Sequence, residues 1–139
     1  LPTLGHNVED LGAHTLDWED DYPDFVTPCA HKVAKEQNSF GVIIGGSGQG
    51  EAMAANRVPG ARAAVFYGEE KAVVPLEVEG GSSRDGYDVV RLTRRHNNAN
   101  ILSLGARFIS ATQAITSVNI FRETPFSDAP RHARRLAKF

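Results

Sequence analysis

Short apolar runs alternate along this chain with longer stretches that favour helices. The run from Phe40 to Ile44 is rich in β-branched residues and carries no charge, which is typical of a strand buried on both faces. Glycines follow it directly, and the next segment, 51–56, has high helix propensity. Further strands are predicted at 61–66 and 101–104, and further helices at 23–37, 89–95, 112–121 and 129–138. This alternation predicts an α/β fold with a largely parallel sheet.

Two segments fit the alternation less well. A first short run lies at 8–11, between Gly5 and Gly12, where Val8 and Leu11 flank two acidic residues. Residues 68–86 are irregular, because 73–78 has the composition of a short strand whereas 80–83 reads Gly-Gly-Ser-Ser, which is typical of a loop. We therefore expect one domain over residues 1–139, with an irregular insertion at 68–86.

Composition narrows the functional classes. The 139 residues suffice for one domain, and 15 Lys and Arg against 17 Asp and Glu give a net charge of −2, so no overall attraction to nucleic acid or anionic membranes is expected. The single cysteine, Cys29, excludes an intramolecular disulfide, and no Cys/His cluster has metal-site spacing. No apolar run of about 18 residues and no signal peptide is recognised. We expect a soluble cytoplasmic protein without metal or cofactor.

The glycine-rich segment after the Phe40 to Ile44 run is the strongest candidate for chemistry. A strand that leads through glycines into a helix presents backbone N–H groups where the helix dipole also favours negative charge. The spacing Gly46-x-Gly48-x-Gly50 is not the dinucleotide pattern, and no Lys-Ser/Thr pair follows it. The pattern therefore predicts either an anion-binding loop or a tight connection that binds nothing.

Glu51 is the first residue after these glycines. A carboxylate here can act as the base that moves a proton between adjacent carbons of a sugar, while loop amides and the Ser47 hydroxyl stabilise the enediolate oxygen. Acidic residues are also common in the first turn of a helix, where they only complement its dipole. The local sequence leaves both interpretations open.

Six segments in the same order resemble the ribose-5-phosphate isomerase B family, which also includes allose- and galactose-6-phosphate isomerases. The segments are 4–12, 21–24, 41–62, 96–100, 104–107 and 131–135. The resemblance implies a three-layer α/β/α, Rossmann-like fold with a mostly parallel sheet of about five strands. Compared with the family pattern, this chain lacks the first strand, its Asp-His turn and most of the helix that follows.

The resemblance assigns the glycine loop to catalysis. It implies that this loop holds the enediolate oxygen, through the segment Gly46, Ser47, Gly48, Gln49 and Gly50. Many family members place a catalytic cysteine immediately before the loop, where this chain has Gly45, and a second branch uses a glutamate that matches Glu51. His96 matches the residue that helps to open the furanose ring. The residues alone favour a different interpretation of His96, as a surface histidine near a helix end.

A basic segment near the end of the chain matches the family's phosphate site. The resemblance implies that Arg131, His132 and Arg135 bind the substrate phosphate across a dimer interface, and Arg131 and Arg135 are spaced to share one helix face. The alternative is a basic, solvated helix. The resemblance implies a sugar contact at Asn97 and further substrate-binding positions at Tyr22 and Arg107, while Tyr22 is equally suited to packing with its hydroxyl as an anchor.

We therefore expect an aldose–ketose isomerase that converts ribose 5-phosphate to ribulose 5-phosphate without a cofactor, as a homodimer or dimer of dimers with the site at the subunit interface. One alternative is a non-catalytic sugar-phosphate-binding or structural subunit of a hetero-oligomeric isomerase. A weaker one is nucleotide binding at the glycine loop.

Overall fold

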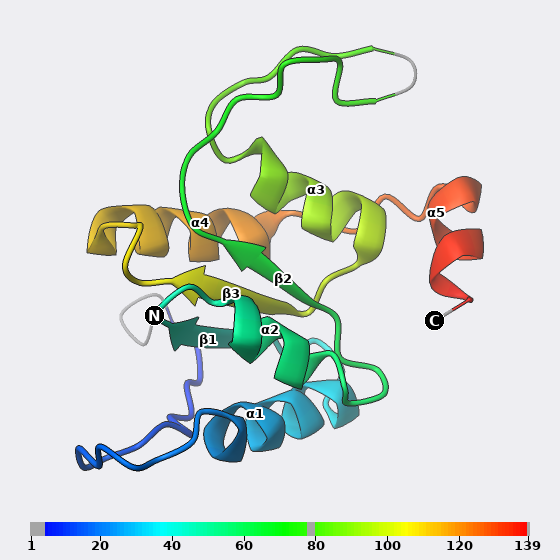
Figure 1. The fold of residues 1–139 in the computed structure, drawn as a ribbon. Helices are drawn as coiled ribbons and strands as arrows, with labels where there is room; N and C mark the ends of the chain where they lie inside the picture. Colours follow the sequence, from blue (N-terminus) through cyan, green and yellow to red (C-terminus); the bar gives the residue numbers. More distant parts are fainter. Residues whose placement is uncertain (1–4, 78–79, 139) are drawn as a thin grey trace.

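The computed structural model describes residues 5–77 and 80–138. Its sheet has three parallel strands, β1 (Gly41–Gly45), β2 (Ala63–Phe66) and β3 (Ile101–Gly105), in the order β1-β3-β2 (Figure 1). Gly41 and Ala63 both lie opposite Ile101, so the strands start level, and β2 ends one position before β1 and β3. β3 is buried along its whole length because it is paired on both sides and covered on both faces.

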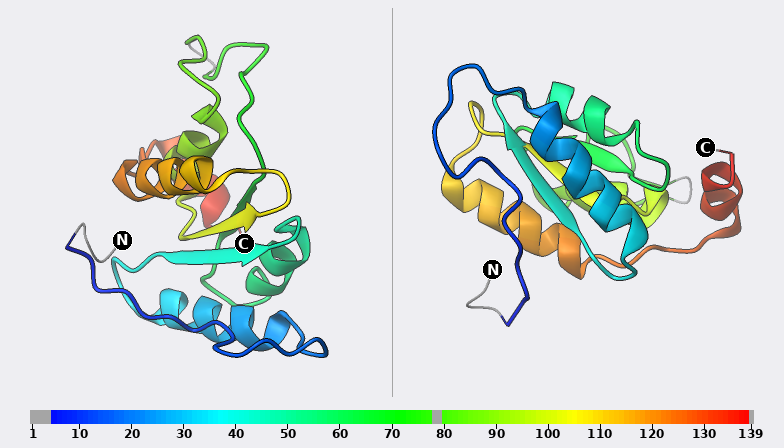
Figure 2. Two further views of the ribbon diagram at one scale, coloured as in Figure 1. Left: turned by 90° about the vertical axis from the view of Figure 1, so that its left-hand side faces the viewer. Right: turned by 90° about the horizontal axis from the view of Figure 1, so that it is seen from below.

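Helices cover both faces of this sheet (Figure 2). On one face lie α1 (Pro23–Lys35) and α2 (Gln49–Ala55), which pack against each other and share a core with β1. On the other face lie α3 (Asp88–Asn97) and α4 (Ala111–Glu123), whose apolar residues surround Phe66 and Phe121. α5 (Pro130–Leu136) contacts α3. The three-layer α/β/α prediction is confirmed.

The strands and helices begin and end for local reasons that the sequence contains. Pro23 starts α1, since its fixed φ suits the first turn and its missing N–H is not needed there. Ser110 caps α4 in a capping box with Gln113. Within the described residues no helix is long and apolar enough to cross a membrane.

Within the described residues, the two segments that fit the alternation less well do not join the sheet. The run at 8–11 forms no strand, and Val8 is 47% exposed. A strand needs a neighbour that supplies backbone partners, and no described strand lies beside this run. Residues 73–77 form bends with one isolated bridge, Glu77 to Gly80, and Val78 of the predicted short strand lies outside the described residues.

The insertion leaves β2, extends away from the sheet and returns into α3 (Figure 1). Its returning end is anchored by Asp88, whose buried carboxylate accepts hydrogen bonds from the Ser83 hydroxyl and the Arg84 N–H at 2.8 Å each. Arg91 pairs with Asp88 and with Asp85, and holds the pKa of the Asp85 carboxyl down to about 2. The segment is thus tied to the first turns of α3.

Candidate active site

The glycine loop connects the end of β1 to α2, and β3 fixes its shape. The Ser103 hydroxyl donates to the Gly48 carbonyl at 2.6 Å, and the N–H groups of Ala106 and Arg107 donate to the carbonyls of Gly45 and Gly46. Gly48 has a φ of 76°, in the left-handed region that favours glycine. In these three hydrogen bonds the carbonyl groups of Gly45, Gly46 and Gly48 accept, so the bonds hold the loop in place without using its backbone N–H groups.

The donors of this loop remain available. In the part of the chain that the structure describes, the backbone N–H groups of Gly46, Ser47 and Gly48 make no hydrogen bond. The exposed Ser47 hydroxyl accepts the N–H of Gln49 at 3.3 Å, which keeps it beside them. Adjacent unpaired amides at the start of a helix are suited to an anionic oxygen.

The side chain of Glu51 folds back onto Gly45. A methyl group placed on Gly45 would lie 1.8 Å from Oε1 of Glu51 and 2.0 Å from its Cδ, so the carboxylate occupies the volume that any side chain at this position would need. Glu51 is only 9% exposed. The glycine in place of the family's cysteine therefore makes room for this carboxylate at the end of β1.

Two further predicted residues complete this cluster. The Tyr22 hydroxyl lies against Gly50, since a methyl group there would be 2.6 Å from it. The Arg107 guanidinium lies against Gly46, where a methyl group would be 3.0 Å from its Cζ. We call the set of Tyr22, the 46–50 loop, Glu51 and Arg107 the carboxylate cluster.

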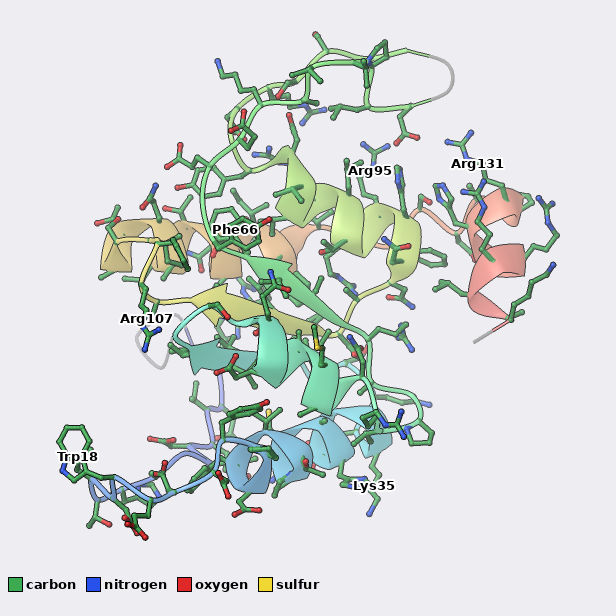
Figure 3. All side chains as sticks on the ribbon, viewed as in Figure 1. Trp18, Lys35, Phe66, Arg95, Arg107 and Arg131 are labelled. Carbon is green, nitrogen blue, oxygen red and sulfur yellow. The ribbon has the colours of Figure 1, made fainter. Side chains whose placement is uncertain are left out.

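The other predicted residues gather elsewhere. His96 lies in the last turn of α3, and its ring centroid lies 4.2 Å from that of His132 on α5. Figure 3 shows Arg131 and Arg95 together at the α3–α5 end of the molecule, while Arg107 lies at the other end. β3 separates the two groups, since α3 precedes its first residue and Arg107 follows its last, and four strand steps span about 13 Å. The structure does not bring His96 and Glu51 together within one chain.

A carboxylate from the insertion joins this second group. Oε1 of Glu77 lies 2.8 Å from Nε2 of His96 and 3.3 Å from the guanidinium of Arg95, and Oε2 accepts from Arg131 at 2.7 Å. The hydrogen bond from His96 and the nearby positive charges hold the pKa of the Glu77 carboxyl below its usual value. We call these residues, with His132, the cationic cluster.

His132 is the most buried member of the cationic cluster, at 4% exposed. The Arg131 Nε–H donates to its Nε2 at 3.1 Å, so that nitrogen is an acceptor and Nδ1 carries the proton. Nδ1 then donates to the Ser127 hydroxyl at 3.0 Å, and Ser127 donates to the Arg95 carbonyl at 2.7 Å. Burial, together with His96 and Arg131, lowers the pKa of His132, consistent with a neutral ring.

The cationic cluster borders a hollow of about 560 Å³ between the insertion, α3 and the segment before α5. Glu77, Arg95 and Ser127 line it. Asn97 and Arg135 are exposed, on α3 and α5 respectively. Among the described residues, no group of His, Cys, Asp and Glu is arranged to hold a metal ion.

A family model described as Ribose/Galactose Isomerase matches residues 1–79 and 84–139 of this sequence. The chain belongs to this isomerase family. It is 39% identical over 136 residues to ribose-5-phosphate isomerase B of Mycolicibacterium paratuberculosis, covering 98% of this chain and 74% of that protein. It is 37% identical to the probable ribose-5-phosphate isomerase B of Mycoplasma genitalium, covering 99% of this chain and 79% of the relative.

Solved structures of the family agree with the fold. The crystal structure of the Mycoplasma genitalium ribose-5-phosphate isomerase B with bound ribulose-5-phosphate matches with a TM-score of 0.81 at 36% identity, over 99% of this chain and 78% of that one. The Clostridium thermocellum enzyme matches with a TM-score of 0.80 at 34% identity, over 99% and 79% of the two chains. The resemblance inferred from six sequence segments is thereby confirmed.

Within this isomerase family member, two residues of the cationic cluster were not predicted. Arg95 has a local signal, because it belongs to the basic run Arg94-Arg95-His96 at the end of a helix. Glu77 has none, since it lies 19 residues from His96 and 54 from Arg131 in an irregular segment. Only the path of the insertion brings it to the cluster.

Proposed function

We propose that this chain is an aldose–ketose isomerase that interconverts ribose 5-phosphate and ribulose 5-phosphate, with Glu51 as the base. The observation that carries the proposal is the buried Glu51 carboxylate, held against Gly45 beside a loop with unpaired backbone N–H groups. A base and a set of hydrogen-bond donors next to each other are what an enediolate intermediate requires. The names of the relatives support this substrate.

The chemistry follows from the carboxylate cluster. Glu51 removes the proton from C2 of the open-chain aldose, and the electron pair moves through C1 to the carbonyl oxygen, which becomes an enediolate oxygen. The loop amides and Ser47 stabilise this negative charge, and the Arg107 guanidinium beside Gly46 adds a positive one. The proton of the C2 hydroxyl then moves to the C1 oxygen, and Glu51 returns its own proton to C1 as the C2 carbonyl forms, which produces the ketose.

We infer that a second copy of the chain supplies the remaining groups. The carboxylate and cationic clusters lie at opposite ends of β3, so one chain alone cannot surround one sugar phosphate with both. In the homodimer or dimer of dimers that we propose, His96 and Asn97 contact the sugar and Arg131 and Arg135 contact its phosphate. The buried His132 supports the phosphate site indirectly, by accepting the hydrogen bond of the Arg131 Nε–H. Arginine forks suit a dianionic phosphate.

A change of Glu51 to Gln tests the base. Gln keeps the size of the side chain but removes the negative charge, so kcat should fall by about 10²- to 10⁴-fold while ribose 5-phosphate still binds. The control is Glu19→Gln, in an exposed loop, which should leave kcat unchanged. A Glu51→Gln protein with the wild-type rate would exclude this base. Binding without turnover by the wild type would favour a non-catalytic sugar-phosphate-binding subunit.

Mixing two inactive variants tests the shared site. Glu51→Gln lacks the base and Arg131→Ala lacks part of the phosphate site, so each alone should be inactive. A dimer of one chain of each kind contains one intact site, because each chain then contributes its undamaged cluster. Activity should return when the two are unfolded and refolded together. A mixture that forms mixed dimers, shown by native mass spectrometry, but stays inactive would contradict a site between subunits.

A further inference from the structure

Glu77 is the one member of the cationic cluster that comes from the insertion, and its carboxylate makes three contacts. Its carboxylate contacts His96 through Oε1 and Arg131 through Oε2, at 2.8 Å and 2.7 Å. The side chains of Glu77 and His96 are 19% and 22% exposed, so water has limited access to the bond between them. Arg95 adds a third contact at 3.3 Å, which leaves the carboxylate little freedom to turn.

This geometry decides which nitrogen of His96 carries the proton. An ionised carboxylate only accepts hydrogen bonds, so Nε2 of His96 must be the donor. In the neutral ring, Nδ1 is then the nitrogen with a free electron pair. The carboxylate can stay ionised, since two guanidinium groups accompany it.

We propose that Glu77 is a positioning residue that fixes His96 with Nε2 protonated, so that Nδ1 exchanges protons with the sugar. This inference rests on the proposed isomerase function. In ring opening, Nδ1 takes the proton of the anomeric hydroxyl, the bond from C1 to the ring oxygen breaks with its electron pair on that oxygen, and Nδ1 returns the proton there. Glu77 stabilises the imidazolium that exists in between.

The arrangement is a carboxylate–histidine pair assembled from two segments. His96 belongs to α3, which the sequence predicts, and Glu77 to the insertion, whose end is anchored on the same helix by Asp88. His96 lies on α3, and the insertion that carries Glu77 is anchored to the same helix, so one chain alone sets the position of Glu77 relative to His96. The insertion therefore has a defined role in this protein, which is to orient the ring-opening histidine.

A direct test is the tautomer of His96, read from long-range ¹H–¹⁵N NMR of the ring nitrogens in the intact protein. The wild type should show a protonated Nε2. Glu77→Gln offers one acceptor oxygen where Glu77 offers two, and with two arginines competing for it the amide N–H group should face His96 and move the proton to Nδ1. Glu77→Asp keeps both oxygens and should retain the wild-type tautomer. Glu70→Gln, an exposed position in the same insertion, is the matched control.

Kinetics with ribose 5-phosphate supply the second readout. Glu77→Gln should lower kcat by about 10-fold with little change in KM, and Glu77→Asp should recover most of it. The magnitude is the lower end of the roughly 10- to 100-fold loss that follows removal of the group that orients a metal-ligating histidine. The proposal is overturned if the His96 tautomer is unchanged in Glu77→Gln. It is equally overturned if KM falls while kcat is constant, because Glu77 would then be a competitor of the substrate phosphate for Arg131.

The two proposals fail in different ways. If the wild-type protein does not isomerise ribose 5-phosphate, the isomerase assignment fails, while the NMR experiment still reports whether Glu77 sets the tautomer. If the wild type is active and Glu77→Gln is equally active with the same tautomer, only the role of Glu77 fails.

Discussion

Replacement of Gly45 by alanine is the sharpest test of the carboxylate cluster, because it adds one methyl group in a known direction. That methyl group would lie 1.8 Å from Oε1 of Glu51, whereas real Cβ contacts are essentially never shorter than 3.0 Å. The Glu51 carboxylate must therefore move by at least 1.2 Å, which is the difference between the two distances. The backbone can stay in place, since the atoms in conflict belong to the end of a flexible side chain.

We expect the Gly45→Ala substitution to lower the catalytic rate rather than the stability of the fold. A displacement of about 1 Å at a reacting group lowers a rate by about 10²-fold, so kcat for ribose 5-phosphate should fall by about two orders of magnitude in Gly45→Ala. KM should change little, because the bonds from Ser103, Ala106 and Arg107 still hold the loop. The assay is formation of the ketose at several substrate concentrations, together with a thermal unfolding curve to show that the fold is intact.

Two controls make the result interpretable. Gly12→Ala adds a methyl group in an exposed segment, 3.2 Å from Asp10, and should behave as the wild type. In a Glu51→Gln background, Gly45→Ala should cost much less than on its own, since the group it displaces is no longer a base. A folded Gly45→Ala protein with wild-type kcat would refute the reasoning, because it would show that the observed position of Glu51 is not needed.

Three further predictions concern stability and reactivity. Asp88→Ala should lower the free energy of unfolding by about 1–3 kcal/mol in urea titrations, because the Ser83 hydroxyl and the Arg84 N–H lose a buried acceptor; an unchanged midpoint would contradict this. The pKa of His132 is lowered in the folded protein, so the unfolded chain binds the proton first as the pH falls below 6.5. Stability should therefore decrease below that pH, and less steeply in His132→Asn; equal slopes would exclude a buried neutral ring. Burial raises the pKa of the Cys29 thiol, so iodoacetamide at pH 8 should modify it more slowly than a free thiol until urea is added.

Most secondary structure was predictable because its signals are local. The unbroken β-branched run before the glycines marks β1, and glycines end it at the observed place. Pro23 marks the start of α1, and the predicted end of that helix differs by two residues from the observed Lys35. The run at 8–11 gave no clear signal, because two acidic residues interrupt it, and it forms no strand because strand formation depends on a partner.

At the candidate site, too, some features were predictable from local sequence and others were not. The glycine spacing and the acidic residue after it were visible in the sequence, and so was the basic segment that became α5. Whether Glu51 reaches into the loop or into solvent was not visible, since both are compatible with the first turn of a helix. The separation of His96 from Glu51 by the length of β3 was also hidden, because a list of motifs contains no distances.

By itself, the sequence determined the succession of strands and helices along the chain, the membership of an isomerase family and the residues that carry charge at the candidate site. These depend on local propensity and on residue identity, which are written along the chain. Only the tertiary structure decided that Glu51 folds onto Gly45, that the predicted residues form two clusters, and that Glu77 contacts His96. Those contacts join residues that are distant in sequence and whose side chains cannot occupy the same volume. They are therefore fixed by the path of the whole chain.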